Sequence, residues 1–363
     1  MQRNHTEKPY REIIQRNHTE EFTSLGQRKK VKMETIAQAL GVSVVTVSNA
    51  LNGRRGVSES MRRQIVQKAQ ELGYNAENRS AGTKKKSYII GCMVASRYVQ
   101  EFPSFYMEIY KNIAREAGQS DCITVLEVVS PEMENENAYA AAFQETRPDG
   151  IILIGELQRT YVSHLHEHNP DVPFVCVDDY DTREDMDYVL TDNFGGMECV
   201  THLVLEQGFS DLYFVGTVGA TDSINDRYLG YCKALERRGL DRCEKQVIPD
   251  RENGILITPQ LPEKLPQAFI CSCDRTAFAV IRELRARGVR VPEDVSAAGF
   301  DNFPRETPEH IRLTTYRNDE KVIAQISLHI LLTRMERPDT RTCGVRIVEG
   351  SVVRGESVKY RRH

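Results

Sequence analysis

From residue 87 onward, short and continuous apolar runs alternate with segments long enough to form amphipathic helices. The runs are YIIGCMVA, CITVLEVV, DGIILIG, PFVCVDD, DLYFVGTVG, QAFICSCD and DVSAAGFDN, and the segments between them include GGMECVTHLVLEQG and RTAFAVIRELRARGV. A strand that is apolar along its whole length is typical of a parallel sheet whose two faces are both covered by helices. The alternation therefore predicts an α/β fold for residues 87–363.

The length and composition restrict the class of protein. A chain of 363 residues exceeds one compact core, so several folded units are expected. No apolar run approaches the roughly 18 residues of a transmembrane helix, and the first thirty residues lack the apolar stretch and cleavage site of a secretory signal. We therefore expect a cytoplasmic protein without a membrane partner. Nine scattered cysteines without a CxxC pair predict reduced thiols and no metal site.

Charge is distributed unevenly along the chain. Residues 28–86 carry thirteen Lys or Arg against four Glu, a net charge of +9, whereas residues 87–363 carry 31 basic against 44 acidic residues, a net charge of −13. A basic block joined to an acidic body is typical of a nucleic-acid contact module attached to a unit with another role. A solvated basic surface without a ligand is the alternative.

Residues 31–73 carry the pattern of three short helices, with breaks at Gly41 and between Gly53 and Gly56. Apolar residues recur at spacings of three and four, as in helices that share a small core. The positions expected to face that core are Ile36, Ala37 and Leu40, then Val47, Ala50 and Leu51, then Met61, Ile65, Ala69 and Leu72. The turn at Gly41 gives the first two helices the spacing of a helix-turn-helix.

The second of these helices begins with side chains that this core does not use. We expect Ser43 to cap it, and Ser58 to cap the third helix. Near its N-terminus, where a recognition helix meets base edges and phosphates, the outward positions are Val44, Val45, Thr46, Ser48 and Asn49. A bare helical hairpin would not require the basic flank formed by Arg54, Arg55, Arg62 and Arg63. The segment therefore predicts a DNA-binding surface.

Carboxylates follow several of the apolar runs. Because parallel sheets hold ligands beyond the carboxyl ends of their strands, Asp178, Asp274 and Asp301 are candidates for a binding pocket. Of these, Asp274 is expected to cap the following helix rather than contact ligand. No GxGxxG follows the first run, and no P-loop, HExxH or GxSxG motif occurs. Dinucleotide binding and the corresponding hydrolases are thus disfavoured, and no cofactor is expected.

Several motifs, in order along the chain, resemble the LacI/GalR family of transcriptional regulators. TIAQALGVSVVTVSNALNGRRGVSESMRRQIVQKAQELGY resembles its DNA-binding headpiece, and LTDNFGGMECVTHLVLEQGFSDLYFVG, DRYLGYCKALERRGL and AFAVIRELRARGVRVPEDVSAAGFDN resemble its effector-binding core. The similarity spans residues 31–358. It implies a small all-α helix-turn-helix headpiece followed by two Rossmann-like lobes of a periplasmic-binding-protein-like core.

The resemblance also implies a domain organisation. An N-terminal tail covers residues 1–30, where the hexapeptide QRNHTE occurs twice and apolar residues are too few to offset the entropy of ordering. The remaining units are a helix-turn-helix domain over 31–73, a hinge linker over 74–86, and an effector-binding and dimerisation domain over 87–363, with an N-lobe of about 87–190 and 315–342 and a C-lobe of about 191–314 and 343–360. The linker lacks the leucine that family members wedge into the operator, so operator bending is expected to be weaker or to be supported through phosphates by Arg79 and Lys84 to Lys86.

Roles for headpiece residues follow from the resemblance by position. Base-reading places correspond to Val44, Val45 and Asn49, phosphate-contacting or helix-positioning places to Ser43, Thr46, Ser48 and Asn52, and the basic flank to Arg54 and Arg55. Many family members have Arg where this chain has Asn49. Asn pairs bidentately with adenine and Arg with guanine, so the operator is expected to differ from the commonest half-site of the family.

In the core, the resemblance implies that Arg227 and Asp301 are the principal hydrogen-bonding residues for a small effector. Asp178 is a further candidate, and Phe105 could pack against a sugar or base ring. An Arg donor opposite a carboxylate suits a polyhydroxylated ligand, because each hydroxyl both donates and accepts. For each of these residues the alternative is a structural role, such as an ion pair.

The resulting hypothesis is a sequence-specific repressor that binds double-stranded operator DNA as a homodimer and responds to a small effector, most simply a carbohydrate. Effector binding could release DNA or, for a corepressor, favour it. A solute-binding protein for transport is one alternative, but it would carry a signal peptide and no basic headpiece. An α/β enzyme using Asp178, Asp274 or Asp301 is another, but no nucleophile–base pair or cofactor loop supports it, and no enzymatic activity is expected.

Overall fold

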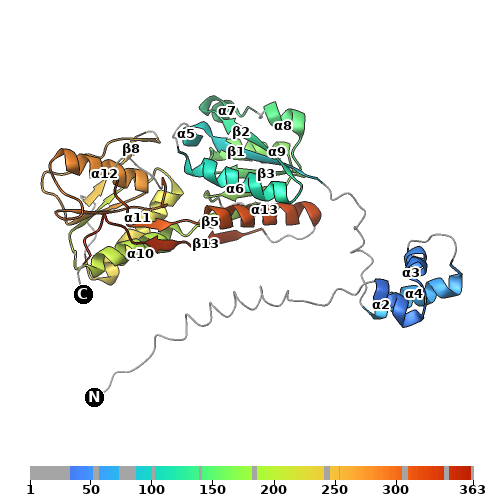
Figure 1. Cartoon of the computed structure of the whole chain (residues 1–363). Coiled ribbons are helices and arrows are strands. Elements are labelled where there is room, and N and C mark those ends of the chain that lie inside the picture. The colour runs from blue at the N-terminus through green and yellow to red at the C-terminus, as the bar shows by residue number, and fades with distance from the viewer. Residues whose placement is uncertain are drawn as a thin grey trace, which may run out of the picture. The chain divides into compact units, whose positions relative to one another are not determined.

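The computed structural model divides into two compact units, Met1–Lys85 and Lys86–His363 (Figure 1). The residues it describes are 33–51, 57–72, 87–99, 103–138, 141–181, 186–240, 246–252, 254–304, 310–338 and 343–360. The predicted tail over 1–30 and hinge linker over 74–86 lie outside these ranges. So do Asn52, Arg54 and Arg55.

The first unit is a helical headpiece. It consists of α2 (Met33–Leu40), α3 (Val44–Leu51) and α4 (Glu59–Glu71). Its buried core contains Ile36, Ala37, Val47, Ala50, Ile65 and Ala69, with Leu40, Leu51, Met61 and Leu72 packed at the edge. The predicted inward positions are therefore confirmed. Both predicted caps are also present: Ser43 Oγ accepts from Thr46 N at 3.1 Å, and Ser58 Oγ accepts from Met61 N at 3.4 Å.

The second unit contains two lobes, each built on a parallel sheet. The N-lobe sheet has the strand order β13-β5-β4-β3-β1-β2. Its strands are β1 (Ile89–Ala95), β2 (Ile123–Val129), β3 (Gly150–Ile154), β4 (Phe174–Val177), β5 (Asp187–Thr191) and β13 (Val345–Val348). All neighbouring strands pair in parallel. Every residue of β3 and β4 is buried, as their apolar runs predict.

Helices cover both faces of the N-lobe sheet. They are α5 (Ser96–Val99), α6 (Phe105–Gln119), α7 (Pro131–Glu136), α8 (Ala141–Thr146), α9 (Arg159–His168) and α13 (Glu320–Glu336). In Figure 1, α6 and α13 lie side by side on one face, where they pack on Cys92 and Val94 of β1. The alternate residue Met93 faces α8 and α9 on the other side.

The C-lobe repeats this arrangement with the strand order β11-β10-β6-β7. Its strands are β6 (Leu212–Val215), β7 (Val247–Ile248), β10 (Ala268–Cys271) and β11 (Ser296–Ala298). One face packs on α10 (Asn193–Glu206) and α11 (Asp222–Arg237), and the other on α12 (Asp274–Ala286). Two antiparallel pairs complete it: β8 (Arg251–Glu252) with β9 (Ile255–Leu256), and β12 (Thr315–Arg317) with β14 (Ser351–Val353).

The chain crosses between the lobes from β5 to α10, from β12 to α13 and from β13 to β14. These crossing segments are joined to one another. Asp192 N donates to Val348 O at 3.1 Å, and Gly350 N donates to the Tyr316 hydroxyl at 2.7 Å. The paths from one lobe to the other therefore form a single hydrogen-bonded hinge.

The expected lobe boundaries differ from the structure in their last segments. The strand β13, expected in the C-lobe, pairs with β5 of the N-lobe, and β12, expected in the N-lobe, pairs with β14 of the C-lobe. The reason is physical: a strand of three or four residues can extend either sheet, and its own pattern does not indicate which edge it joins. None of the helices in the described ranges is long and apolar enough to cross a membrane.

Candidate functional site

The headpiece presents polar residues at the start of α3. Ser43 is exposed, and Thr46, Ser48 and Asn49 are partly exposed. The Ser43 and Thr46 hydroxyl oxygens lie 2.8 Å apart, so the pair forms a fixed polar corner at the helix N-terminus. A hydroxyl of such a corner can donate to a phosphate oxygen, and the backbone N–H groups at the helix start point the same way.

Two headpiece residues differ from the simplest expectation. Val44 is partly buried and packs against the headpiece core, so only part of its side chain is available to DNA. Arg62, expected in the basic flank, donates from Nη1 to the Ala50 carbonyl at 2.8 Å and thus ties α4 to the end of α3. Arg63 is exposed. The side chain of Val45 lies outside the described set.

A cavity of about 120 Å³ lies between the lobes of the core. The N-lobe contributes Tyr98, Phe105, Tyr106 and Asp178, and the C-lobe contributes Arg227, Arg251, Cys273, Arg275, Asp301 and Phe303. All four residues expected at the effector site therefore line this cavity. Arg251, Arg275 and Tyr106 are additional lining residues that the sequence patterns did not indicate.

Arg227 lies in α11, and its guanidinium is bonded on several sides. Its Nη2 lies 3.0 Å from Asp301 Oδ1, its Nη1 donates to the Ser272 carbonyl at 2.7 Å, and its Nε donates to Asn193 Oδ1 at 2.8 Å. The guanidinium carbon sits 4.0 Å from the centroid of the Phe300 ring. The ion pair with Asp301 is therefore held from several sides before any ligand is present.

The Arg227–Asp301 pair is linked directly to the hinge. Asn193, which bonds Arg227, is the first residue of α10 after the crossing from β5. Asn318 donates to Asp301 Oδ1 at 3.1 Å and lies in the crossing from β12 to α13. A ligand that binds Arg227 or Asp301 is therefore connected to the segments that cross between the lobes, where a change of angle between the lobes would occur.

Asp178 closes the cavity from the N-lobe, directly after β4. It accepts from the Tyr106 hydroxyl at Oδ2, at 3.0 Å, and its carboxyl also interacts with the Thr191 side chain. Burial raises the pKa of Asp178, and the nearby Arg227 opposes that rise. A carboxyl group in a cavity wall is suited to accept a hydrogen bond from a ligand hydroxyl.

Asp274 has a different role from the one expected. The helix α12 begins at this residue, and no side chain caps it. Asp274 instead accepts from Phe303 N at 2.8 Å and from the Thr315 hydroxyl at 2.7 Å. Both contacts use the carboxyl group to fix the turn after Asp301. This is possible because the chain after Asp301 passes close to the start of α12.

Contacts across the cleft hold the lobes together around the cavity. Phe105 and Phe303 approach with their ring centroids 6.0 Å apart, and Arg275 donates to the Pro103 carbonyl. At the rim, Arg159 of α9 pairs with Asp222 of α11 at 3.2 Å. Each lobe therefore contributes both apolar and charged groups to closure.

Asp179, beside this rim, gives a prediction for the pH dependence of stability. Burial and the neighbouring Glu156 raise its pKa to about 6, against the opposing effect of Arg159. The ionised form is thus disfavoured in the folded state, so stability falls as pH rises from 3.8 through 6. Asp179→Asn should increase the free energy of unfolding at pH 7 by about 1–2 kcal/mol, after allowance for partial exposure.

Urea denaturation between pH 4.5 and 7.5 measures this effect. The advantage of Asp179→Asn should shrink as pH falls below 6. The exposed Asp171→Asn serves as a control for the same change in net charge. An advantage of equal size at every pH would show that ionisation of Asp179 is not its cause.

Comparison with known proteins agrees with both units. Residues 32–77 match the family model described as bacterial regulatory proteins, lacI family, and residues 200–358 match the periplasmic binding protein-like domain. The HTH-type transcriptional repressor PurR of Photorhabdus laumondii is 26% identical over 91% of this chain and 99% of its own length. The probable HTH-type transcriptional repressor ExuR of Bacillus subtilis is 26% identical over 86% of this chain and 93% of its own.

Solved structures show the same fold at low identity. A transcriptional regulator CelR–cellobiose complex aligns with a TM-score of 0.62 at 20% identity, covering 90% of this chain and 99% of that one. The lac repressor dimer bound to operator and the anti-inducer ONPF aligns with a TM-score of 0.61 at 19% identity, covering 91% and 99%. A LacI family regulator from Enterococcus faecium with bound ribose has a TM-score of 0.61 at 19% identity, covering 76% and 100%.

The agreement extends from the headpiece through both lobes and is not confined to one shared domain. The relatives are transcriptional regulators rather than enzymes, which removes the α/β enzyme hypothesis. The chain belongs to the LacI/GalR family of DNA-binding transcriptional regulators.

Proposed function

We propose that this protein is a sequence-specific repressor that binds a pseudo-palindromic operator as a homodimer and is controlled by a small polyhydroxylated effector between its lobes. The observation that carries the proposal is the cavity in which Arg227, Asp301 and Asp178 converge, in a chain that also carries a helix-turn-helix. A binding site and a reading helix in one chain are the two parts of a ligand-controlled regulator.

The DNA-binding half of the proposal rests on α3. Asn49 and Thr46 are partly exposed near its N-terminus, and the flank around residues 54 and 55 is basic. One short reading helix covers only a few base pairs, so two headpieces are needed for a site of useful specificity. The proposed contacts are Ser43, Val44, Val45, Thr46, Ser48, Asn49, Asn52, Arg54 and Arg55.

The effector half rests on the chemistry of the cavity. The Arg227–Asp301 pair offers donors and acceptors side by side, the Asp178 carboxyl offers a further acceptor, and the ring of Phe105 forms an apolar wall. This mixture suits a ring that bears hydroxyls. The complexes of similar regulators with cellobiose and with ribose support a sugar, and the cavity of about 120 Å³ favours a compact one.

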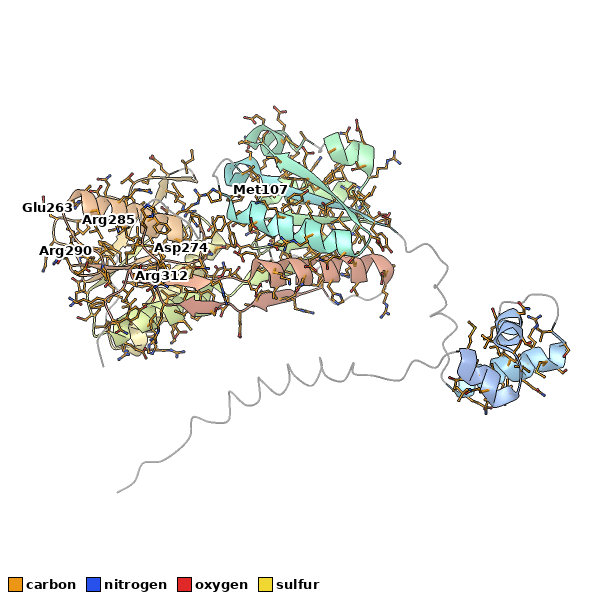
Figure 2. All side chains as sticks on the ribbon, in the orientation of Figure 1. Met107, Glu263, Asp274, Arg285, Arg290 and Arg312 are labelled. Atoms are coloured by element: carbon orange, nitrogen blue, oxygen red, sulfur yellow. The ribbon has the colours of Figure 1, made fainter. Side chains whose placement is uncertain are left out.

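Selection from random duplexes tests the DNA-binding half. The full chain should recover a palindromic motif, and the logarithm of the affinity should fall steeply and linearly with the logarithm of salt concentration. Asn49→Arg should move one position of each half-site from adenine toward guanine. Arg312 is an exposed residue of the effector-binding domain (Figure 2), and Arg312→Gln should leave both the motif and the salt dependence unchanged. Recovery of no motif at low salt would reject the proposal.

A further inference from the structure

Arg251 is a cation in the cavity wall that no sequence motif indicates. It is the first residue of β8, and its side chain is only 17% exposed. One edge of its guanidinium is occupied, since Nε and Nη2 donate to the two oxygens of Asp250, each at 3.0 Å. The pairing resembles an internal clamp that fixes the orientation of the other edge.

The clamp is itself held by buried groups. Asp250 is fully buried and accepts from the Ser272 and Thr276 hydroxyls, each at 2.7 Å, and from Thr217 N at 2.9 Å. Arg251 N donates to the Thr217 hydroxyl, which in turn donates to Arg251 O, both at 3.0 Å. Backbone and side chain of Arg251 are thus both positioned in advance of any ligand.

The opposite edge of Arg251 has hydrogen-bonding capacity to spare. A guanidinium carries five N–H groups, and the bidentate contact uses two of them. Within the described residues, no group accepts a hydrogen bond from Nη1 of Arg251. A rigid donor edge in a cavity wall is suited to bind a planar or tetrahedral oxyanion.

Oriented donors on this side of the cavity favour an oxyanion. Three arginines, Arg227, Arg251 and Arg275, line the cavity together with the carboxylates Asp178 and Asp301. Asp301 is already paired with Arg227, and Asp250 with Arg251, so the arginines act here as positioned N–H donors rather than as excess positive charge. The first turn of α12, a helix of thirteen residues, begins at the same wall because its cap Cys273 and Arg275 both line the cavity. The positive end of that helix adds to the field of the arginines.

We infer that the effector is an acidic polyhydroxylated molecule whose carboxylate or phosphate is bound by Arg251, while its hydroxyls meet the Arg227–Asp301 pair. The inference rests on the proposed function for the regulatory role of this ligand. Arg251 then determines which class of sugar is bound, and Arg227 and Asp301 provide the contacts that any sugar would share.

Matched ligand pairs test the inference on the full chain. Calorimetry and thermal shift would compare glucuronate with glucose, galacturonate with galactose, gluconate with sorbitol, and glucose 6-phosphate with glucose. In at least one pair the acidic member should bind at least tenfold more tightly than its neutral counterpart. The uronate and phosphate arms separate a carboxylate from a phosphate.

Variants separate ligand recognition from the structural role of Arg251. Arg251→Lys keeps a positive charge beside Asp250 but loses the fork, and Asp250→Asn with Arg251→Gln removes both charges together. Each should lower affinity for the acidic member by about 10- to 100-fold and leave the neutral member unchanged. Arg290→Gln, at the outer edge of the C-lobe (Figure 2), should change neither.

The outcomes are distinct. Equal binding of acidic and neutral members in every pair, including no binding in any pair, overturns the inference, as does an acid preference that survives in both Arg251 variants. A neutral sugar that alters operator binding would leave the proposed function standing without the inference. An acidic ligand that needs Arg251 but leaves operator binding unchanged would support the inference and reject the proposed function.

Discussion

Replacing Arg227 by alanine should lower the free energy of unfolding of the core by about 3–5 kcal/mol, the range for breaking a buried ion pair on one side. The substitution leaves Asp301 without its charge partner and the Ser272 carbonyl and Asn193 Oδ1 without their donor. Each buried polar group that loses its partner adds a desolvation penalty. Urea denaturation of the full chain, followed by circular dichroism, measures the loss.

A matched control lies on the same helix. Lys233 of α11 pairs with Glu236 at 3.2 Å, but both side chains are substantially exposed. Lys233→Ala should therefore change stability by less than about 0.5 kcal/mol. If Arg227→Ala cost no more than Lys233→Ala, the network around Arg227 would not stabilise the fold, and its role would be confined to ligand.

Two hydrogen bonds couple the cavity to the hinge. Arg227 is bonded to Asn193 and Asp301 to Asn318, so both ligand-facing charges are anchored in segments that cross between the lobes. A ligand can shift the angle between the lobes only through a difference in its contacts between the two states. These two anchors are where such a difference is converted into movement.

Much of the fold could be predicted from the sequence because the central strands of both sheets are apolar on both faces. Runs such as those of β3 and β10 would expose apolar side chains on any sheet with a solvated face, so they predict a parallel sheet covered on both faces. Every residue of both strands is buried. The headpiece core was equally predictable, since Ile36, Val47 and Ile65 follow helical spacing. Strands of three or four residues near the end of the chain could not be placed, because pairing partners depend on tertiary contacts.

Residues of the candidate site could be predicted only where the apolar run before them was long enough to be recognised as a strand. Asp178 and Asp301 follow clear apolar runs, and both line the cavity. Arg251 follows β7, which is only Val247–Ile248, so the run that could have drawn attention to it is too short. The signal was the Asp250–Arg251 pair, which begins two residues after β7, because Asp178 and Asp301 likewise come within three residues of a strand end.

The role of Asp274 shows why a helix-start pattern can mislead. An acidic residue at the start of α12 predicts a cap. The turn from Asp301 to Phe303 passes close by and offers a backbone N–H that competes for the same carboxyl. Whether the Asp274 carboxyl accepts from the N–H groups of its own helix or from Phe303 N depends on a segment almost thirty residues away. The local sequence does not contain that information.

Gly230→Ala should destabilise the core by about 2–3 kcal/mol, an overpacking penalty reduced by the better helix propensity of alanine. A Cβ at this position of α11 would lie 2.2 Å from the Phe194 carbonyl oxygen and 3.0 Å from Glu198 N, both backbone atoms of α10. The two helices, side by side in Figure 1, therefore meet backbone to backbone here. Backbone atoms cannot rotate aside, so α10 must move as a body.

Gly118 of α6 provides the opposite case, because a Cβ there would meet nothing within 4 Å. Gly118→Ala should be neutral or stabilise by up to about 1 kcal/mol. Gly230→Ala should also weaken effector binding, since α10 begins at Asn193, which positions Arg227. Urea denaturation and calorimetry of both variants measure the two effects. Equal stability of the two variants would mean that α10 and α11 can separate without cost, and intact effector affinity in Gly230→Ala would mean that the position of Asn193 does not control Arg227.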